Sequence, residues 1–350
     1  GIYYKPDSAK AKTCIDGRHQ LVDFARKHKI EHDICGKVVV AVTQSELSNL
    51  EKLYQNGLTN KIEGIEKLTG NQVKSIEPVV ECLAGIRVPC TGIINYRQTT
   101  EKLCELIKSM NPQSCIVLGE EVRNCIHSNN ETRVITQRNT FRTKYMVFCA
   151  GLQADRLAKK NGIKLKERIV GFRGDYYSLT DKAKNKVKNL IYPVPDPAFP
   201  FLGVHFTRMV NGGVECGPNA VFTFKREGYN KTDFNLRDSW SALTYTGTWK
   251  LFRHNLGAGF REYQRAFSKR RFLKTLQRMI PTLSMEDIEP TRAGVRALLL
   301  AKDGNTRDDF RIECTDRSIH VLNAPSPAAT ACLAIADEIC EMAADQFGLV

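Results

Sequence analysis

The stretch from Ile319 to Ile339, IHVLNAPSPAATACLAIADEI, decides the fold prediction for this chain. Its apolar start, Ile319 to Leu322, predicts a strand. Pro325 then predicts a tight turn, because proline fixes φ and has no N–H to donate. Ser326 and Pro327 match the cap and first position of a helix, and apolar residues from Cys332 onward recur at helical spacing. A helix start beyond a strand end can bind an anionic group or an electron-rich ring, but an ordinary connection has the same pattern.

Strand and helix patterns continue on both sides of this stretch. The predicted helices lie at residues 8–29, 46–56, 69–75, 99–110 and 155–160, with a helix-rich segment at 239–280. The predicted strands lie at residues 36–42, 84–88, 92–96, 114–118, 122–127, 132–137, 145–149, 172–179, 202–206, 213–216, 220–224, 292–301 and 310–314. The chain therefore changes from an alternating α/β pattern to antiparallel strands after about residue 168.

The amino-acid composition excludes several classes of function. The chain has 350 residues, 42% of them hydrophobic, and a formal net charge of +14. No apolar run approaches the roughly 20 residues that span a bilayer. Twelve cysteines are present without a CxxC pair, which argues against a metal site and favours a reducing compartment. The run from Lys182 to Lys188 lacks the interleaved aromatic residues of a nucleic-acid site, so we expect no nucleic-acid partner.

Further stretches carry a resemblance that composition does not show. They are GIYYKP at 1–6, RVPCTGIINYR at 87–97, FRGDYY at 172–177, IYPVPDPAFPFLGVHFT at 191–207, GPNA at 217–220 and AGVRA at 293–297. In this order, and together with residues 319–339, they resemble the L-2-hydroxyglutarate dehydrogenase family of the D-amino-acid-oxidase-like FAD enzymes. The resemblance extends over nearly the whole chain.

The resemblance implies a fold of α/β plus α+β class. An FAD-binding Rossmann-like domain at 1–35, 97–168 and 293–350 is interleaved with a mixed, largely antiparallel-sheet substrate domain at 36–96 and 169–292. Family members begin with a strand and a GxGxxG turn for the FAD pyrophosphate. The sequence contains only Gly257-Ala-Gly259 and starts at Gly1. We therefore expect that the first βα unit is missing.

The resemblance also assigns residues to the cofactor. They are Val122, Ala150, Gly151, Gly294, Pro325, Ser326, Pro327, Ala328, Ala329 and Thr330. On the residues alone, small side chains at 150–151 let a backbone approach a ligand closely, but an ordinary strand–helix turn has the same features. Val122 fits a core strand equally well.

His205 is the candidate catalytic base, because an imidazole can accept a hydroxyl proton near neutral pH. A structural histidine is the alternative, and a second family histidine precedes Gly1. Arg296 and Arg173 are candidate clamps for carboxylates, since a guanidinium binds them in a bidentate manner. Asp175 offers Arg173 a structural ion pair instead. Tyr176 and Tyr3 complete the candidate substrate site. Tyr176 and Tyr177 are neighbours on a strand, so they point to opposite faces and only one can face the site. Residues 193–200 form either a rigid wall of the site or a plain connection.

These residues predict FAD-dependent oxidation of L-2-hydroxyglutarate to 2-oxoglutarate, with the hydride passing to the flavin. Electrons then leave to a quinone, another carrier or oxygen. The alternatives are a related flavin amine or amino-acid oxidase, or an inactive fragment that lacks the pyrophosphate loop. A basic helix at 269–278, with Phe272, Leu276 and Met279 on one side, fits either a peripheral membrane contact or a solvated surface. We expect a cytoplasmic enzyme, inner-membrane associated or free, with a mitochondrial location as the alternative.

Overall fold

A nine-stranded sheet forms the larger part of the protein in a computed structural model, which describes residues 1–128, 131–196 and 202–349. Its strands are β2 (Lys37–Ala41), β3 (Glu66–Thr69), β4 (Ala84–Val88), β10 (Arg168–Leu179), β11 (Leu190–Pro193), β12 (His205–Arg208), β13 (Val214–Gly217), β14 (Val221–Phe222) and β15 (Ile288–Leu300). Neighbouring strands follow the order β14, β10, β13, β12, β11, β2, β4, β3, and β15 pairs with β10. Within this sheet the β11–β2 pair is parallel, and the other pairs of its described strands are antiparallel.

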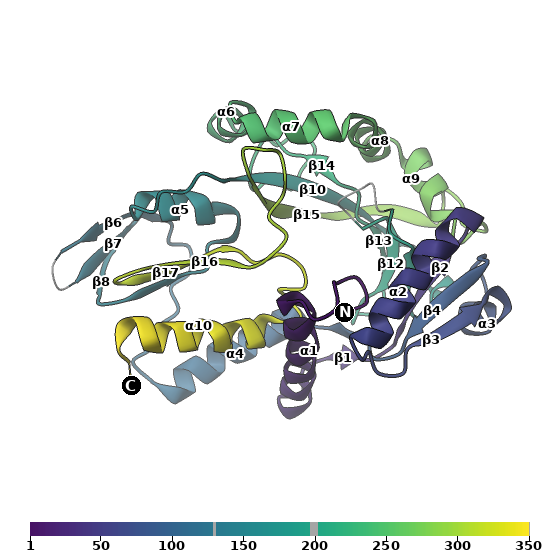
Figure 1. Ribbon diagram of the computed structural model, residues 1–350, viewed down its shortest axis with the longest axis horizontal. Coiled ribbons are helices and arrows are strands. Elements are labelled where there is room, and N and C mark those ends of the chain that lie inside the picture. Colours follow the sequence, from purple (N-terminus) through teal and green to yellow (C-terminus); the bar gives the residue numbers. More distant parts are fainter. Residues whose placement is uncertain (129–130, 197–201, 350) are drawn as a thin grey trace.

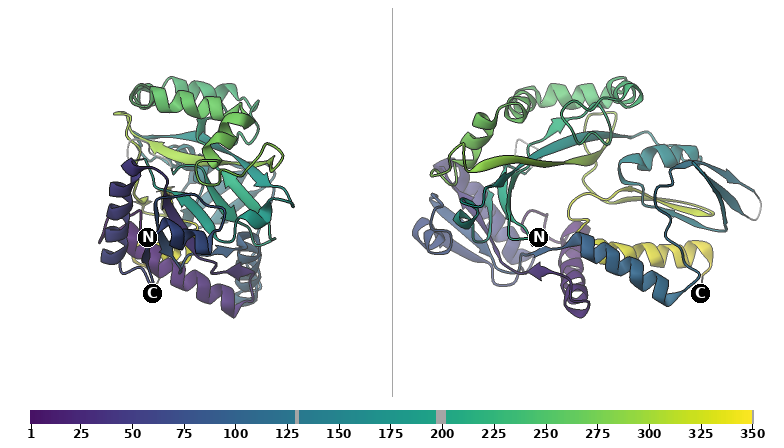
Figure 2. Two further views of the ribbon diagram at one scale, coloured as in Figure 1. Left: turned by 90° about the vertical axis from the view of Figure 1, so that its right-hand side faces the viewer. Right: turned by 180° about the vertical axis from the view of Figure 1, so that it is seen from behind.

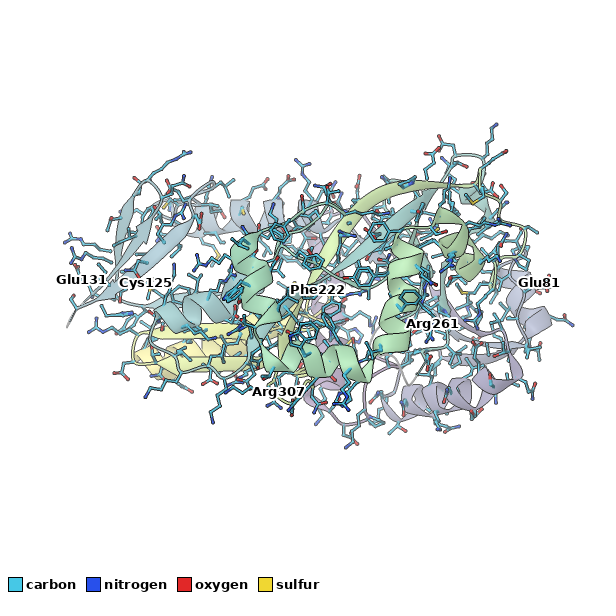
Figure 3. The ribbon with its side chains drawn as sticks, turned by 90° about the horizontal axis from the view of Figure 1, so that it is seen from above. Glu81, Cys125, Glu131, Phe222, Arg261 and Arg307 are labelled. Carbon is cyan, nitrogen blue, oxygen red and sulfur yellow. The ribbon has the colours of Figure 1, made fainter. Side chains whose placement is uncertain are left out.

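Four helices follow one another across one face of this sheet (Figure 1). They are α6 (Leu236–Leu243), α7 (Thr246–His254), α8 (Leu256–Ala266) and α9 (Lys269–Leu276). Seen from above, they spread over the sheet with Phe222 among them and Arg261 on α8 (Figure 3). The core beneath α9 joins Phe272 and Leu276 to Val38, Ile191 and Phe206 of the sheet, and each of these side chains is at most 1% exposed. Apolar burial of this size holds the helices on the sheet.

The other face of the sheet is covered by α2 (Leu47–Thr59), which follows η1 (Gln44–Glu46). Helix α3 (Gly70–Ile76) lies on the side of α9, because its Val73 belongs to the core beneath that helix. A second core cluster lies on the side of α2 and joins Ile2 of the amino-terminal segment to Val39, Leu50 and Ile86. The amino-terminal segment is thus packed against the sheet rather than loose.

The second half of the molecule holds two small sheets (Figure 1). Its strands are β6 (Val122–His127), β7 (Thr132–Thr136), β8 (Thr140–Thr143), β9 (Met146–Phe148), β16 (Arg311–Thr315) and β17 (Ser318–Asn323). Its helices are α1 (Ala9–Lys27), α4 (Tyr96–Met110), α5 (Ala154–Lys160) and α10 (Cys332–Phe347), with η2 (Gly151–Gln153) before α5. The order β16–β17–β9 places the end of β17 beside the β9–α5 connection. A short pair of β1 (His32–Asp33) and β5 (Ile93–Ile94), and η3 (Lys184–Lys186), complete the described elements.

The predicted mixed fold is confirmed, and three local predictions are wrong. Residues 114–118 form no strand, although their composition is apolar. Helix α10 begins at Cys332, and residues 326–331 form turns, in which Ala328 donates to the carbonyl oxygen of Pro325 and Ala331 to that of Pro327. Ser326 is therefore not its cap, since Ala331 occupies that position. The apolar side of α9 faces the core, so it is not free for a membrane.

No helix in the described part of the chain is long and apolar enough to cross a bilayer.

Candidate functional site

His205 lies on β12 with its Nδ1 2.8 Å from the carbonyl oxygen of Gly203. A carbonyl oxygen only accepts, so Nδ1 carries the proton and Nε2 keeps a lone pair. Burial lowers the pKa of His205 to about 4, and the nearby cations Arg296 and Lys37 act in the same direction. The imidazole is therefore neutral at pH 7 and able to accept a proton at Nε2.

Tyr192 fixes the ring of His205 from the neighbouring strand. The two rings stack with their centroids 4.0 Å apart and their planes 24° apart. The pairing of Ile191 with Phe206 places Tyr192 directly across from His205, which explains the stack. The ammonium of Lys37 in turn lies 5.0 Å from the Tyr192 ring centroid and 4.8 Å from that of Tyr3.

Arg296 on β15 approaches the same place from the other side. Burial lowers its pKa, while Tyr176 and Glu262 raise it, and its charge in turn acts on both Tyr176 and His205. Tyr176 points away from the core that holds Tyr177, as the strand alternation predicted. Its ring lies against Gly217, the strand partner of His205, where a Cβ would come within 2.9 Å of the tyrosine. The glycine thus lets Tyr176 pack beside the histidine.

Arg173 has a different environment. Its Nε donates to Asp175 at 2.9 Å, and its Nη1 donates to the carbonyl oxygen of Asn230 at 2.8 Å. Asp175 is held by Asn219, which donates to its second oxygen at 3.1 Å. Arg173 is 4% exposed. The structure therefore gives Arg173 the ion pair that the sequence offered as the alternative to a substrate clamp.

A cavity of about 580 Å³ brings the amino-terminal segment next to the turn after β17. Its walls include Tyr3, Lys37 and Tyr192 on one side and Ser326, Pro327, Ala328, Ala329 and Thr330 on the other. Tyr4 connects the two sides, with its hydroxyl 3.3 Å from Ser326 Oγ. The amino terminus accordingly lies in the middle of the molecule (Figure 2). Six of the predicted site residues, Tyr3 and five of the turn, meet in this cavity.

The remaining predicted cofactor positions lie outside the lining of that cavity. Gly151 has φ +49° and Gly294 has ordinary φ, and a Cβ at either would meet nothing within 4 Å. Val122 begins β6, and Ala150 packs in part against a core cluster of α5 and β15. Pro325 lies in the same turn as Ser326 but does not line the cavity. Of the predicted wall 193–200, residues 197–200 lie outside the described residues.

The described residues fit a bound flavin in two respects. The hydroxyl of Tyr3 is buried in the cavity wall and has no hydrogen-bond partner among the described residues. Buried hydroxyls normally have a partner, so a polar ligand atom is a suitable one. Small side chains at Ser326, Ala328 and Ala329 leave the cavity wall open to a flat ring. Among the residues described, no group of three His, Cys, Asp or Glu side chains is placed to hold a metal ion.

Sequence reasoning missed Lys37 and Tyr192. The sequence pattern placed Lys37 only in an apolar strand at 36–42, and Tyr192 lay in the family-like stretch 191–207 without a role of its own. A lysine at the start of a buried strand is the signal that marked the position, because charged side chains are rarely buried without a partner.

This chain belongs to the FAD dependent oxidoreductase family, whose family model matches residues 1–342. FAD is accordingly its cofactor, and the protein is an oxidoreductase. Its relatives include the L-2-hydroxyglutarate dehydrogenase of Indibacter alkaliphilus, which is 42% identical over 348 residues, covering 99% of this chain and 87% of the relative. The mitochondrial L-2-hydroxyglutarate dehydrogenase of Mus musculus is 39% identical over 366 residues, covering 100% of this chain and 78% of the relative.

Solved structures of flavin oxidases share the fold. The L-alpha-glycerophosphate oxidase of Mycoplasma pneumoniae with FAD bound has a TM-score of 0.73 at 21% identity, covering 96% of this chain and 80% of that one. Glycine oxidase of Geobacillus kaustophilus has a TM-score of 0.69 at 14% identity, covering 96% of this chain and 80% of that one. At these identities the likeness describes the fold alone.

Proposed function

We propose that this protein oxidises L-2-hydroxyglutarate to 2-oxoglutarate, with bound FAD as the hydride acceptor. The observation that carries the proposal is the neutral His205, fixed as the tautomer that accepts at Nε2 and accompanied by the cation of Arg296. The relatives named above, at 42% and 39% identity, act as L-2-hydroxyglutarate dehydrogenases by name and support this substrate.

Each side chain has a specific task in this reaction. His205 accepts the substrate hydroxyl proton at Nε2 as the carbon–hydrogen bond breaks. Arg296 binds the carboxylate next to the reacting carbon through its planar guanidinium. Tyr176 and Tyr192 hold the arginine and the histidine in place, while Tyr3 offers its hydroxyl to the ligand. The turn 325–330, with Val122, Ala150, Gly151 and Gly294, is proposed to hold the cofactor.

The division into two parts is proposed along the predicted boundaries. Residues 1–35, 97–168 and 293–350 then serve the cofactor, with Arg296 as the residue among them that also reaches the substrate, and residues 36–96 and 169–292 serve the substrate. The nine-stranded sheet supplies His205, Arg296 and Tyr176, whereas the turn after β17 belongs to the other half.

We propose that the electron acceptor is a quinone, another carrier or oxygen. We also propose that the protein contacts a membrane surface peripherally through helices α6–α8 rather than through α9. Trp240 is 71% exposed, Trp249 58% and Phe260 66%. The same helices carry five basic residues, Arg237, Lys250, Arg253, Arg261 and Arg265. Exposed aromatics beside basic side chains suit an anionic lipid surface. A cytoplasmic enzyme that associates with the inner membrane fits this arrangement; a mitochondrial location is the alternative.

Co-sedimentation with vesicles of anionic and of neutral lipid tests this contact. We expect binding to anionic vesicles that Trp240→Ser with Trp249→Ser abolishes. Equal binding by the variant, or self-association instead of lipid binding, would overturn the assignment.

Anaerobic titration with L- and D-2-hydroxyglutarate tests the reaction. We expect bleaching of the flavin absorbance by the L form alone, with formation of 2-oxoglutarate. Bleaching by glycine or another amino acid instead would favour an amine or amino-acid oxidase. A flavin that ignores all of these compounds would overturn the proposed substrate.

A further inference from the structure

We propose that Lys37 binds the carboxylate of the substrate that is remote from the reacting carbon, and that it selects dicarboxylates over monocarboxylates. This inference rests on the proposed function, which supplies a substrate with two carboxylates. It concerns a residue that the sequence argument did not assign to the site.

Lys37 is a half-buried cation without an anionic partner among the described residues. It begins β2 and lines the cavity, where its ammonium lies over the rings of Tyr3 and Tyr192 at 4.8 and 5.0 Å from their centroids. The described residues place no carboxylate within ion-pair distance of it and give it no hydrogen bond. Cation–π contacts offset only part of the cost of removing an ammonium from water. A ligand carboxylate would complete its environment.

The other cations of the cavity wall differ from Lys37. Arg18 is paired with Glu63 at 2.7 Å, so its charge is already neutralised. Lys61 is exposed to solvent. Lys37 is thus the cation of the described cavity wall that combines partial burial with the lack of a carboxylate.

Its place relative to His205 fits a substrate with two charged ends. In the sheet, β11 separates β2 from β12, and Tyr192 of β11 touches both Lys37 and His205. Arg296 lies on β15, on the other side of β12 in the strand order. The two cations therefore approach the histidine from opposite sides, and the fields of both reach its ring. One cation is available for each carboxylate when the carbon between them reacts at His205.

The length of the side chains supports this assignment. Adjacent strands lie about 4.8 Å apart, so the backbone of β2 is roughly 10 Å from that of β12. A lysine stem spans part of this distance and ends over the Tyr192 ring beside His205. The ammonium then stands beyond the reacting carbon, where the far end of a five-carbon diacid lies and a monocarboxylate has no charge.

Replacing Lys37 by methionine tests the proposal, because methionine keeps an unbranched apolar stem and loses the charge. For L-2-hydroxyglutarate we expect kcat/KM of the flavin-loaded protein to fall about 10- to 100-fold, mainly through KM. For L-2-hydroxybutyrate, which has no remote carboxylate, we expect no change. The exposed Lys52→Met removes the same charge from α2 and is the matched control.

The pH dependence gives a second readout. Burial lowers the pKa of Lys37 to about 8, with Cys14 and Cys90 acting in the opposite direction. The other titratable groups that face it are Tyr3, Tyr192 and His205, and the pKa values of both tyrosines are raised by burial. KM for the diacid should therefore rise above about pH 8 as Lys37 loses its proton. Lys37→Arg keeps its charge and should remove this rise.

Calorimetric titration with glutarate, a dicarboxylate without a hydroxyl, separates the two proposals. We expect wild-type protein to bind glutarate and Lys37→Met to bind it about 10-fold or more weakly. Unchanged glutarate affinity, or an equal loss with the monocarboxylate and the diacid, would overturn the role of Lys37. If glutarate binding depends on Lys37 but the protein does not oxidise L-2-hydroxyglutarate, only the proposed reaction is overturned. If Lys37→Met unfolds, Lys37→Gln and Lys37→Arg supply the same comparison.

Discussion

At the candidate site the two faces of strands β2, β11 and β12 carry different kinds of side chain, and Val39 of β2 adds a second apolar core beside the site. One face presents Val38, Ile191 and Phe206 to the core beneath α9, and each is at most 1% exposed. The other face presents Lys37, Tyr192 and His205, which contact one another through ring stacking and a cation–π contact. Every residue of the second set is a direct chain neighbour of one of the first. Core residues and candidate site residues thus alternate along each strand, because successive side chains point to opposite faces of the sheet.

This alternation also fixes the register of the strands. A slip by one residue would turn His205 into the core and expose Phe206, so burial of the apolar face fixes the position of the face that carries His205. The comparison predicts that substitutions on the two faces have different consequences. Two experiments test it directly, and two extend it to other buried charges of the molecule.

The largest effect is expected for His205→Gln. Loss of the proton acceptor should lower kcat by about 10²- to 10⁴-fold, while the flavin content and the unfolding midpoint stay near those of the wild type. Turnover normalised to bound flavin, measured beside chemical unfolding, checks this. Full turnover in a folded, flavin-containing variant would remove His205 from the mechanism.

The reciprocal substitution is Phe206→Ala on the core face. Emptying a fully buried phenylalanine site should lower the free energy of unfolding by about 3–5 kcal/mol, through lost transfer free energy and the cavity left behind. Urea unfolding followed by circular dichroism measures it. Phe206→Leu is the milder control and should cost less, and a loss below 1 kcal/mol for the alanine variant would contradict the packing described for this face.

A third prediction extends the comparison to the other half of the molecule. His320 is 1% exposed, and burial lowers its pKa to about 4. The unfolded chain therefore binds a proton at higher pH than the folded one, so this contribution to stability is present above the unfolded pKa near 6.5 and is lost as the pH falls towards 4. Acidification from pH 7 to pH 5 should cost about 2 kcal/mol through this group.

Unfolding free energies at several pH values check the third prediction. The slope should become shallower in His320→Gln, whose side chain does not titrate. His205 titrates with the same sign, so His205→Gln should also reduce the slope. A stability that rises on acidification would contradict both assignments.

The smallest effect is expected for Arg296→Lys. The lysine keeps the charge but loses the planar fork, so KM for the diacid should rise about 10-fold with little change in stability. Arg173→Lys is the matched comparison, since it disturbs the buried pair with Asp175 and should lower stability instead. Initial-rate kinetics and thermal unfolding of both variants separate the two arginines. Equal effects on KM would contradict their different environments.

Most of the fold followed from local patterns. Ser8 caps α1, α4 ends at Met110 as expected, and the predicted strands 172–179 and 213–216 overlap β10 and β13. These elements obey periodicity and capping, which act over a few residues. The predicted start of α10 is too early, because the backbone of residues 325–331 closes in turns before the regular helix begins at Cys332.

The sequence by itself determined the alternation of strand faces, the family and its cofactor, and His205 as a candidate base. Tertiary structure alone decided the use of the two arginines, since Arg173 meets Asp175 and Asn230 whereas Arg296 reaches Tyr176 and His205. It also decided the place of Lys37. The physical reason is that a charge takes its role from its partners, and those partners come from strands that are distant in sequence and adjacent only in the sheet.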